Sequence, residues 1–223
     1  ATGSWQAPGK DFRFHGSYGT GFRAPSYFEL FGAIPAFNFV GNPDLKAERS
    51  TGWDAGVEWN ALENLLMDVT WFDNRIRNLI DFSPANIGRA TTRGIELSAQ
   101  GKICDDYLGW RGCYTWQQAS DDVTGSRLVR RARHRASFDL MGEPVKGLVL
   151  GAGMTFSKGI EDNDFSIFPS VRKELDSVVL LRAYCSYQVN DSVSVYGRVE
   201  NLLDRTYEEI ANYPGRGLGV FGG

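Results

Sequence analysis

The sequence predicts an all-β chain whose long antiparallel strands cross a membrane as part of a transmembrane β-barrel. Apolar and polar residues alternate over stretches longer than the ~5–6 residues typical of a strand in a globular sheet. The connections between these stretches alternate between short and long, as the two ends of an outer-membrane barrel do. Four tryptophans lie near strand ends, where a barrel carries its interfacial aromatic girdles: Trp53, Trp59, Trp71 and Trp110.

The clearest alternation lies between Asp176 and Tyr207, where two long strands flank a tight turn. Asn190-Asp191 supplies that turn, since both residues tolerate the backbone angles of a tight hairpin. One face of the pair is apolar and the other is more polar. The apolar positions are Val179, Leu181, Ala183, Cys185, Tyr187 and Val189 before the turn, and Val193, Val195, Gly197 and Val199 after it.

The same period of two recurs along the rest of the chain and predicts about ten strands. In the third of them, for example, Leu65, Met67, Val69 and Trp71 are set against Asp68 and Thr70. In chain order the expected strands are Lys10–Phe22, Trp53–Asn60, Leu65–Trp71, Ile95–Ile103, Trp110–Gln117, Leu128–Met141, Leu148–Phe156, Val179–Val189, Val193–Glu200 and a final segment after Pro214.

Five long connections are expected at one end of these strands and four short turns at the other. The first long loop is rich in proline, glycine and aromatic residues, and the third is polar. The long loops are Arg23–Ala47, Arg75–Ala90, Gln118–Ser126, Lys158–Arg172 and Asp204–Pro214; the short turns lie near residues 62–64, 105–109, 143–147 and 190–191.

Composition agrees with a barrel and excludes several other classes. The 223 residues are 42% hydrophobic and 23% charged, and no run reaches the ~18–20 apolar residues that a membrane-spanning helix needs. Barrel strands alternate, so a low mean hydropathy does not argue against them. A net charge of -3 argues against nucleic acid as a partner. A soluble β-sandwich also alternates, but rarely with strands this long, so the barrel is the favoured interpretation.

Three motifs resemble TonB-dependent outer-membrane receptors, the family of siderophore and cobalamin transporters. They are GFRAPSYFELF (Gly21–Phe31), GNPDLKAERS (Gly41–Ser50) and VENLLDRTYEE (Val199–Glu209). Four further segments support them in the family's order: FDNRIRNLID (Phe72–Asp81), RGIELSAQ (Arg93–Gln100), LVRRARHRASFDL (Leu128–Leu140) and YPGR (Tyr213–Arg216). The resemblance extends from near residue 10 to the end of the chain.

The resemblance implies TonB-dependent, energy-coupled uptake of a scarce nutrient, such as a ferric siderophore or cobalamin, across the bacterial outer membrane. Such barrels have ~22 strands and a plugged lumen. Residues 1–223 are therefore expected to be a C-terminal portion of the barrel domain, without the plug. The end at Gly222-Gly223 departs from the family's usual terminal aromatic residue. Expected partners are outer-membrane lipid, lipopolysaccharide, the nutrient and, through the missing N-terminal part, TonB; no cofactor is expected.

Ligand contacts in this family come from external loops and the plug, so loop residues are the candidates here. The aromatic candidates are Tyr27, Phe28, Phe31, Phe37 and Phe39. The basic candidates, Arg130 and Arg131, belong to a cluster with Arg133 and Arg135 that would attract an anionic ligand or lipopolysaccharide phosphates. The favoured alternative for this cluster is salt bridges with neighbours such as Glu96 or Asp139.

Other residues of the motifs are expected to shape loops rather than read a ligand. They are Gly41, Asn42, Pro43, Leu45, Glu48, Asn201, Asp204 and Tyr207. Cys104 and Cys113 flank a short turn, and the sequence leaves open a disulfide or two free thiols. His15 and His134, the only histidines, show no convergent ligands for a metal site.

Alternative functions differ in what the barrel does. A passive pore would need an open lumen, and a small stand-alone barrel would have to close on itself with these strands, because unpaired edges cost several kcal/mol per group in hydrocarbon. An enzyme is not expected, because a barrel protease would need an Asp/His constellation that the two histidines do not suggest. A soluble sugar-binding β-domain is the remaining non-membrane alternative.

Overall fold

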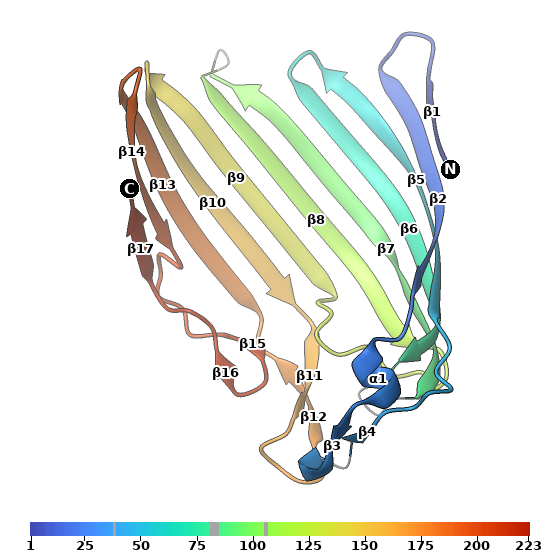
Figure 1. Ribbon diagram of the computed structural model, residues 1–223. Coiled ribbons are helices and arrows are strands. Elements are labelled where there is room, and N and C mark those ends of the chain that lie inside the picture. The colour runs from blue at the N-terminus through green and yellow to red at the C-terminus, as the bar shows by residue number, and fades with distance from the viewer. Residues whose placement is uncertain (38, 81–84, 105–106) are drawn as a thin grey trace.

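The computed structural model describes residues 1–37, 39–80, 85–104 and 107–223, with the side chains of all but 37 and 87. Within these residues the main element is one antiparallel sheet of eleven strands (Figure 1). In spatial order its strands are β1 (Thr2–Gln6), β2 (Phe12–Arg23), β5 (Glu48–Leu62), β6 (Leu65–Ile80), β7 (Asn86–Ile103), β8 (Leu108–Asp121), β9 (His134–Val145), β10 (Leu148–Lys158), β13 (Val178–Asn190), β14 (Val193–Glu200) and β17 (Gly219–Gly222).

Small elements cluster at the end of the sheet where the long connections lie. The first long connection holds a helix, a 3₁₀ turn and a two-stranded sheet: α1 (Tyr27–Phe31), β3 (Ala33–Ile34), η1 (Pro35–Phe37) and β4 (Phe39–Val40). The others hold two more strand pairs: β11 (Ile160–Asp164) with β12 (Val171–Leu175), and β15 (Glu208–Ile210) with β16 (Tyr213–Pro214). We call this the loop end and the opposite end the turn end.

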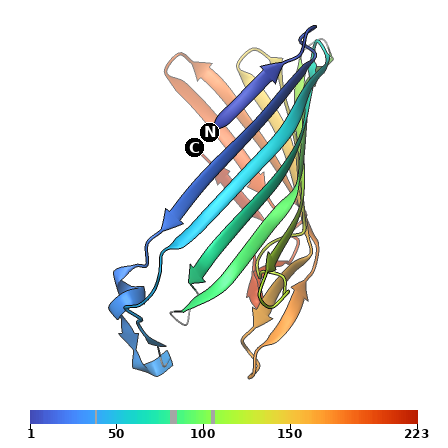
Figure 2. The ribbon, with the colours of Figure 1, turned by 90° about the vertical axis from the view of Figure 1, so that its right-hand side faces the viewer.

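The central strands are long, tilted and curved into the wall of a wide barrel (Figure 2). β5, β6 and β7 have 15, 16 and 18 residues, more than the ~9–11 that a tilted strand needs to cross a bilayer. Across the described residues, β1 and β17 are the two edges of the sheet and do not pair with each other. The expected all-β antiparallel architecture is confirmed, and closure into a small stand-alone barrel is not what this chain adopts.

Register divides the sheet into an apolar and a polar face. Val57, Val69, Leu97 and Tyr114 lie opposite one another in turn across β5, β6, β7 and β8. Val69 and Leu97 are exposed although they lie in mid-strand, so this face has no protein cover and suits lipid. The apolar face carries the even-numbered residues of β2, β8, β9 and β10 and the odd-numbered residues of β5, β6, β7, β13 and β14.

The polar face carries ion pairs between neighbouring strands. Arg13 of β2 donates to Glu58 of β5 at 2.7 Å. Arg182 of β13 pairs with Asp139 of β9 across Gly153 of β10. A Cβ atom at Gly153 would come within 2.6 Å of both partners, so glycine leaves the room that this pair needs. These pairs join strands in the part of the chain expected to line a lumen.

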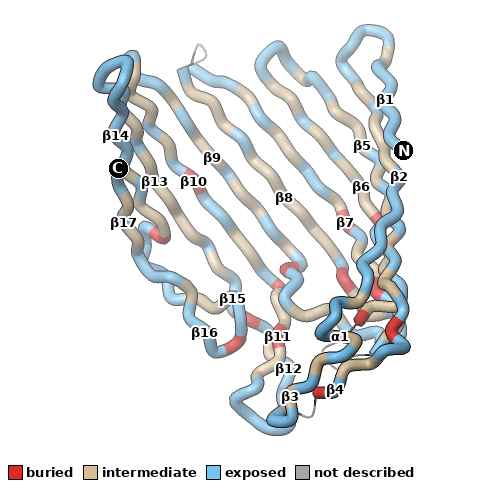
Figure 3. Tube along the Cα trace, in the orientation of Figure 1, coloured by how far each residue is buried: buried red, intermediate tan, exposed pale blue. Residues whose placement is uncertain are grey.

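The sheet itself has little buried apolar core. In the described residues the buried hydrophobic side chains all lie at the loop end (Figure 3): Phe39, Leu45, Ile80, Ala90, Ala119, Ala132, Leu175 and Ala211. Packing of the kind found in soluble domains is therefore confined to the folded loops. No helix in the described part of the chain is long and apolar enough to cross a membrane.

Several predicted boundaries were wrong at the loop end. The expected loop Arg75–Ala90 is mostly strand, because β6 continues to Ile80 and β7 begins at Asn86. β8 likewise continues to Asp121, whereas β9 begins only at His134. The strands remain hydrogen-bonded to each other beyond the point where apolar and polar residues stop alternating. The residues of the apolar face become charged there, so the sequence pattern no longer indicates a strand.

The strand inventory also differs from the prediction. β1 was not expected; it is short and pairs with β2, with Thr2 opposite Ser17. It brings the main sheet to eleven strands rather than about ten. The predicted loop Lys158–Arg172 folds into the β11–β12 hairpin, whose acidic sequence lacks the apolar alternation by which strands are found.

Cys104 and Cys113 do not form a disulfide; both thiols are free. A direct bond would require the turn to be centred near Leu108. Instead Ile103 lies opposite Leu108, and Cys113 lies opposite Ser98, six residues along β7 from Cys104. The observed register therefore keeps the two cysteines apart.

The two faces predict unequal responses to the same substitution in the whole membrane-inserted protein. Leu97→Arg places a charge in the middle of the apolar face and is expected to lower the free energy of unfolding by about 2–4 kcal/mol. Ser98→Arg, one residue along on the polar face, is the matched control and should cost much less. Urea unfolding of the whole protein folded in lipid vesicles measures both losses; equal losses would show that the faces are wrongly assigned.

Candidate functional site

The first loop begins with a capped helix held by an ionic clamp. Ser26 accepts a hydrogen bond from the Glu29 amide, and the Glu29 carboxylate accepts one from the Ser26 amide at 2.6 Å. Arg23, at the end of β2, bridges Glu29 and Glu48. The bonds from Ser26, with Arg23, hold the pKa of the Glu29 carboxyl below its ordinary value. The capping box of Ser26 and Glu29, together with the ion pairs of Arg23, therefore fixes the position of α1 relative to the end of β2.

The aromatic side chains of this loop divide into exposed and packed ones. Tyr27 is 79% exposed and Phe31 56% exposed, and their ring centroids lie 5.1 Å apart. Phe28 stacks on Phe39 at 4.8 Å, and Phe39 is only 6% exposed. Phe39 thus packs inside the loop. It was expected as a candidate ligand contact, and its burial corrects that expectation. The side chain of Phe37 lies outside the described residues.

The motif that follows α1 folds back against it. Asn42 accepts a hydrogen bond from the Asp44 amide at 2.9 Å, which forms a turn ahead of the buried Leu45. A Cβ atom at Gly41 would come within 2.7 Å of the Leu30 backbone, so only glycine fits there. Pro43 is exposed beside them. These residues shape the loop, and Glu48 joins them to β6 by accepting from the Ile80 amide at 2.8 Å.

The basic cluster finds partners other than those the sequence suggested. Arg130 donates to Asp162 of β11 at 3.0 Å, not to Glu96 or Asp139. Arg127 pairs at 2.5 Å with Glu161, which also accepts from Arg172 at 2.9 Å. Arg131 is exposed and donates to the carbonyl oxygen of Arg130. Of the two basic candidates, Arg130 is thus engaged within the loops, and Arg131 faces solvent.

Asp162 joins three loops at one carboxylate. It is 1% exposed, and its oxygens accept from Arg130 and from the amides of Asn163 and Ala211, at 2.9–3.0 Å. Burial alone would raise its pKa, but the hydrogen bonds from Ala211, Asn163 and Arg130 outweigh burial and the pKa lies below its ordinary value. We call Asp162 and these three partners the Asp162 node.

The last loop is shaped by the side chains of Asn201 and Asp204. The Asn201 amide donates to the carbonyl oxygens of Arg205 and Arg216 and accepts from the Arg205 amide at 2.9 Å. Asp204 accepts from the Leu218 amide at 2.8 Å. Both residues have positive φ, 49° and 47°, which asparagine and aspartate tolerate better than most residues. The chain can therefore turn sharply between β14 and β17.

Two further contacts tie this loop to its neighbours. The backbone carbonyl oxygen of Tyr207 accepts a hydrogen bond from the Gly215 amide at 2.7 Å. The Tyr207 ring lies where a Cβ atom at Gly215 would be. Lys173 of β12 donates to Glu208 of β15 at 2.9 Å. That ion pair raises the pKa of the Lys173 ammonium above its ordinary value. The β11–β12 and β15–β16 hairpins are therefore held side by side.

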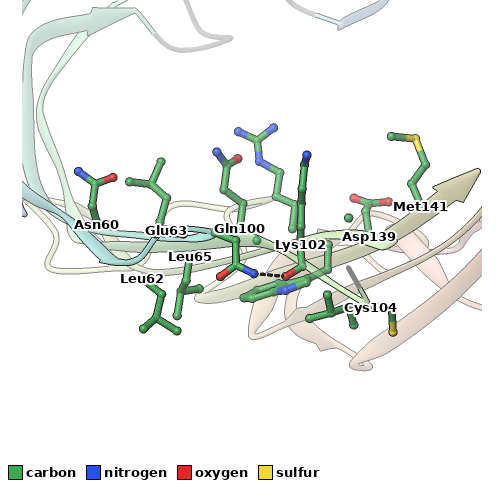
Figure 4. Close-up of a pocket in the computed structure, with 16 residues that line it drawn as sticks. Asn60, Leu62, Glu63, Leu65, Gln100, Lys102, Cys104, Asp139 and Met141 are labelled. Carbon is green, nitrogen blue, oxygen red and sulfur yellow. Dashed lines mark hydrogen bonds between the residues drawn. The ribbon is translucent and has the colours of Figure 1, made fainter. Parts of the chain in front are cut away.

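A polar basin lies at the turn end of the sheet (Figure 4). Its volume is about 1090 Å³, and strands β5 to β9 line it. Gln100, Lys102, Asp139 and Met141 project to one side of the sheet, and Leu62, Leu65 and Cys104 to the other. Asn64 donates to the Lys102 carbonyl oxygen at 2.9 Å across the turn. Charged groups of both signs thus line the polar face at this end.

The histidines are engaged separately. His15 Nε2 lies 2.7 Å from an Asp68 oxygen on the polar face, and His134 Nδ1 lies 2.8 Å from the Tyr114 hydroxyl on the apolar face. In the part of the chain that the structure describes, no group of three or more His, Cys, Asp or Glu side chains is placed to hold a metal ion.

Sequence reasoning missed the Asp162 node. Asp162 lies 32 residues from Arg130 and 49 from Ala211 along the chain. The one available signal was complementary charge, since an arginine-rich stretch near residue 130 and the acidic stretch Glu161–Asp164 both fall in loops at the same end.

Long antiparallel strands, a lipid-suited face and folded loops at one end define part of a transmembrane β-barrel. The family described as TonB dependent receptor-like, beta-barrel matches residues 1–202. This match covers most of the chain, and the chain belongs to that family, whose members are transport receptors.

Solved structures show the same fold. The ferric enterobactin receptor PfeA from Pseudomonas aeruginosa is 18% identical, with a TM-score of 0.77 over 96% of this chain and 38% of its own. The ferric-catecholate import receptor Fiu from E. coli K12 is 21% identical, with a TM-score of 0.69 over 95% and 32%. The copper transporter OprC is 17% identical, with a TM-score of 0.78 over 99% and 37%. The chain therefore spans about a third of the length of these proteins.

The depressed pKa of Asp162 makes the loops sensitive to acid. A carboxyl whose pKa is lower in the folded than in the unfolded chain (~3.9) stabilises above about pH 5 and loses this effect as the pH falls through the folded pKa. The protection of the Ala211 amide against hydrogen exchange, expressed relative to the intrinsic exchange rate at each pH, should therefore be high at neutral pH and lower in acid. Asp162→Asn should lower this protection at neutral pH, reducing the local opening free energy by about 1 kcal/mol or more, and should remove the pH dependence of the protection.

The control for this prediction is Asp164→Asn. Asp164 lies in the same strand and accepts hydrogen bonds from Ser166 and Asn212, but it is not part of the Asp162 node. If both variants had the same effect at Ala211, the node would not be what holds that loop.

Proposed function

We propose that this chain forms part of the barrel of a receptor that takes up a metal chelate across the bacterial outer membrane by energy-coupled transport. The observation that carries the proposal is the combination of one apolar, uncovered sheet face with folded loops at one end only. Membership of the receptor family supports the transport class. PfeA and Fiu, by their names, act on ferric enterobactin and ferric catecholates, and we propose a ferric siderophore as cargo here too.

Residues 1–223 are proposed to be a C-terminal portion of a larger barrel of ~22 strands. The unpaired edges at β1 and β17 support this, because each backbone group left without a partner in hydrocarbon costs several kcal/mol. Pairing with further strands of the receptor would remove that cost. The polar basin then faces the lumen, on the side of the sheet to which Gln100 and Lys102 project.

In this proposal the loops capture the cargo and the barrel serves as a scaffold. Tyr27 and Phe31 present exposed rings on a helix fixed by the Arg23 clamp, so they can stack on a planar chelate with little loss of conformational entropy. Arg131 adds a positive charge that attracts an anionic chelate. The Asp162 node keeps the neighbouring loops in place around them.

Release of the cargo and its passage through the barrel are proposed to require TonB, acting through a plug from the rest of the receptor. A passive pore is the competing function, and it would transport without an energy source. A lipid environment and a scarce nutrient are the proposed partners, and nucleic acid is not one.

Uptake in cells separates these possibilities. Cells that depend on the whole receptor should accumulate a radioiron-labelled ferric catecholate chelate only when TonB is present. Uptake that persisted without TonB would favour the passive pore. Uptake of labelled copper but not of the iron chelate would retain the transport class and change the cargo.

Loop aromatics should control binding of the chelate. Tyr27→Ala with Phe31→Ala is expected to weaken binding about tenfold or more, because exposed anchors of this kind contribute over ~1 kcal/mol each. Phe22→Ala is the matched control, since Phe22 is also 79% exposed but lies on the apolar face of β2. Binding of labelled chelate to cells at 4 °C measures this, and an equal effect of the control would argue against α1 as the contact.

A further inference from the structure

A second cavity, of about 350 Å³, lies on the polar face of the sheet near the loop end. Four adjacent strands, β8, β9, β10 and β13, form its floor, and Glu209 of β15 lines it from the last loop (Figure 1). Register places two rows of polar-face residues side by side across this floor: Thr115, Arg135, Ser157 and Val178 in one row, and Cys113, Ser137, Thr155 and Leu180 in the other. We call this cavity the hydroxyl pocket.

The polar side chains of the hydroxyl pocket lack partners within the protein. Elsewhere on the polar face, Arg13, His15 and Arg182 each lie against a carboxylate of another strand. In the part of the chain that the structure describes, the pocket's own polar groups have no hydrogen-bond or ion-pair partner. They are the hydroxyls of Thr115, Ser137, Thr155 and Ser157, the guanidinium of Arg135 and the carboxylate of Glu209. The pocket therefore offers donors and acceptors that the fold leaves unused.

The two charges of the pocket indicate what it can hold. Arg135 and Glu209 have opposite signs and both are exposed, yet they form no ion pair with each other. A simple anion would pair with Arg135 but would meet the negative charge of Glu209, and a neutral sugar would leave both charges unpaired. A molecule with one carboxylate and one ammonium group matches both. Val178 and Leu180, on the β13 side of the floor, offer contact to a short apolar group.

We propose that the hydroxyl pocket binds a small zwitterion, an α-amino acid with a short apolar side chain. Its carboxylate would lie on Arg135, whose planar fork can donate two parallel hydrogen bonds to it, and its ammonium group on Glu209. The four hydroxyls supply the remaining hydrogen bonds. The volume is at the lower end of the ~300–1,000 Å³ range of ligand pockets, which suits a molecule of this size.

This site goes beyond the proposed capture of a chelate. The chelate is proposed to bind at α1 of the first loop, whereas the hydroxyl pocket is built from β8 to β13 and the last loop. The inference uses the placement of the pocket on the polar face and does not depend on the identity of the cargo.

The test is equilibrium dialysis of the whole receptor in detergent micelles against radiolabelled L-valine, without chelate. The wild type should bind valine, and should bind isovalerate or isobutylamine, which each lack one of the two charges, about tenfold or more weakly. Arg135→Gln should weaken valine binding about tenfold or more, because one charge-assisted hydrogen-bonding partner is lost. Glu209→Gln should have a similar effect, and serves if the Arg135 variant fails to fold, since Glu209 lies exposed in a loop.

The matched control is Arg111→Gln. Arg111 is an exposed arginine of the same face of β8, but it lines the polar basin at the turn end and not the hydroxyl pocket. The control should bind valine as the wild type does.

Three results would overturn the proposal. They are absence of valine binding by the wild type, unchanged binding by the Arg135 and Glu209 variants, and binding of isovalerate as tight as that of valine, which would indicate a simple anion site. Displacement of valine by glucose would likewise replace the zwitterion with a hydroxylated sugar as the ligand class. Absence of TonB-dependent chelate uptake would count against the proposed function only, because valine binding is measured without chelate.

Discussion

Backbone pairing is the constraint on which the rest of this structure depends. In hydrocarbon a strand can satisfy its amides and carbonyls only through its neighbours, so the register must run unbroken across the membrane. Between the strands that the structure describes, register shifts occur only at strand ends, as between Asn60 and Leu62 or Gln188 and Asn190 at the turn end. A slip of one residue would exchange the two faces, placing Arg13 in lipid and Val57 in the lumen. The register thus decides which side chain meets which solvent.

This constraint explains why buried groups lie where they do. A one-layer sheet cannot bury its own side chains, so compact packing arises only where loops fold over one another. Among the described residues there, the most buried side chain is charged: Asp162, which is kept ionised by Arg130 and two amides. Leaving such a carboxylate buried without partners would cost several kcal/mol, so the three loops that supply the partners are favoured in one arrangement.

Period-two alternation allowed the fold class, the two faces and most strands to be predicted from sequence, because lipid and water select side chains directly. It could not locate strand ends beyond the membrane, where Arg75 and Arg77 occupy outward positions of a ladder that continues to Ile80. Nor could it find the Asp162 node or exclude the disulfide, since both depend on which distant residues the register brings together. Phe39 was misjudged for a similar reason: an aromatic residue in a loop can pack on Phe28 as readily as face a ligand.

Arginines at the loop end show how position on a sheet determines chemistry. Arg130 and Arg77 both lie near strand ends, yet Arg130 extends over the loops to a buried carboxylate, whereas Arg77 stands on the apolar face and has no side-chain partner among the described residues. The difference comes from strand length: β6 continues to Ile80, so Arg77 still belongs to the strand and takes its apolar face, whereas β9 begins only at His134, after Arg130. Arginines within the loops are therefore compensated by carboxylates of the protein, whereas arginines on the apolar face of the strand ends stay exposed.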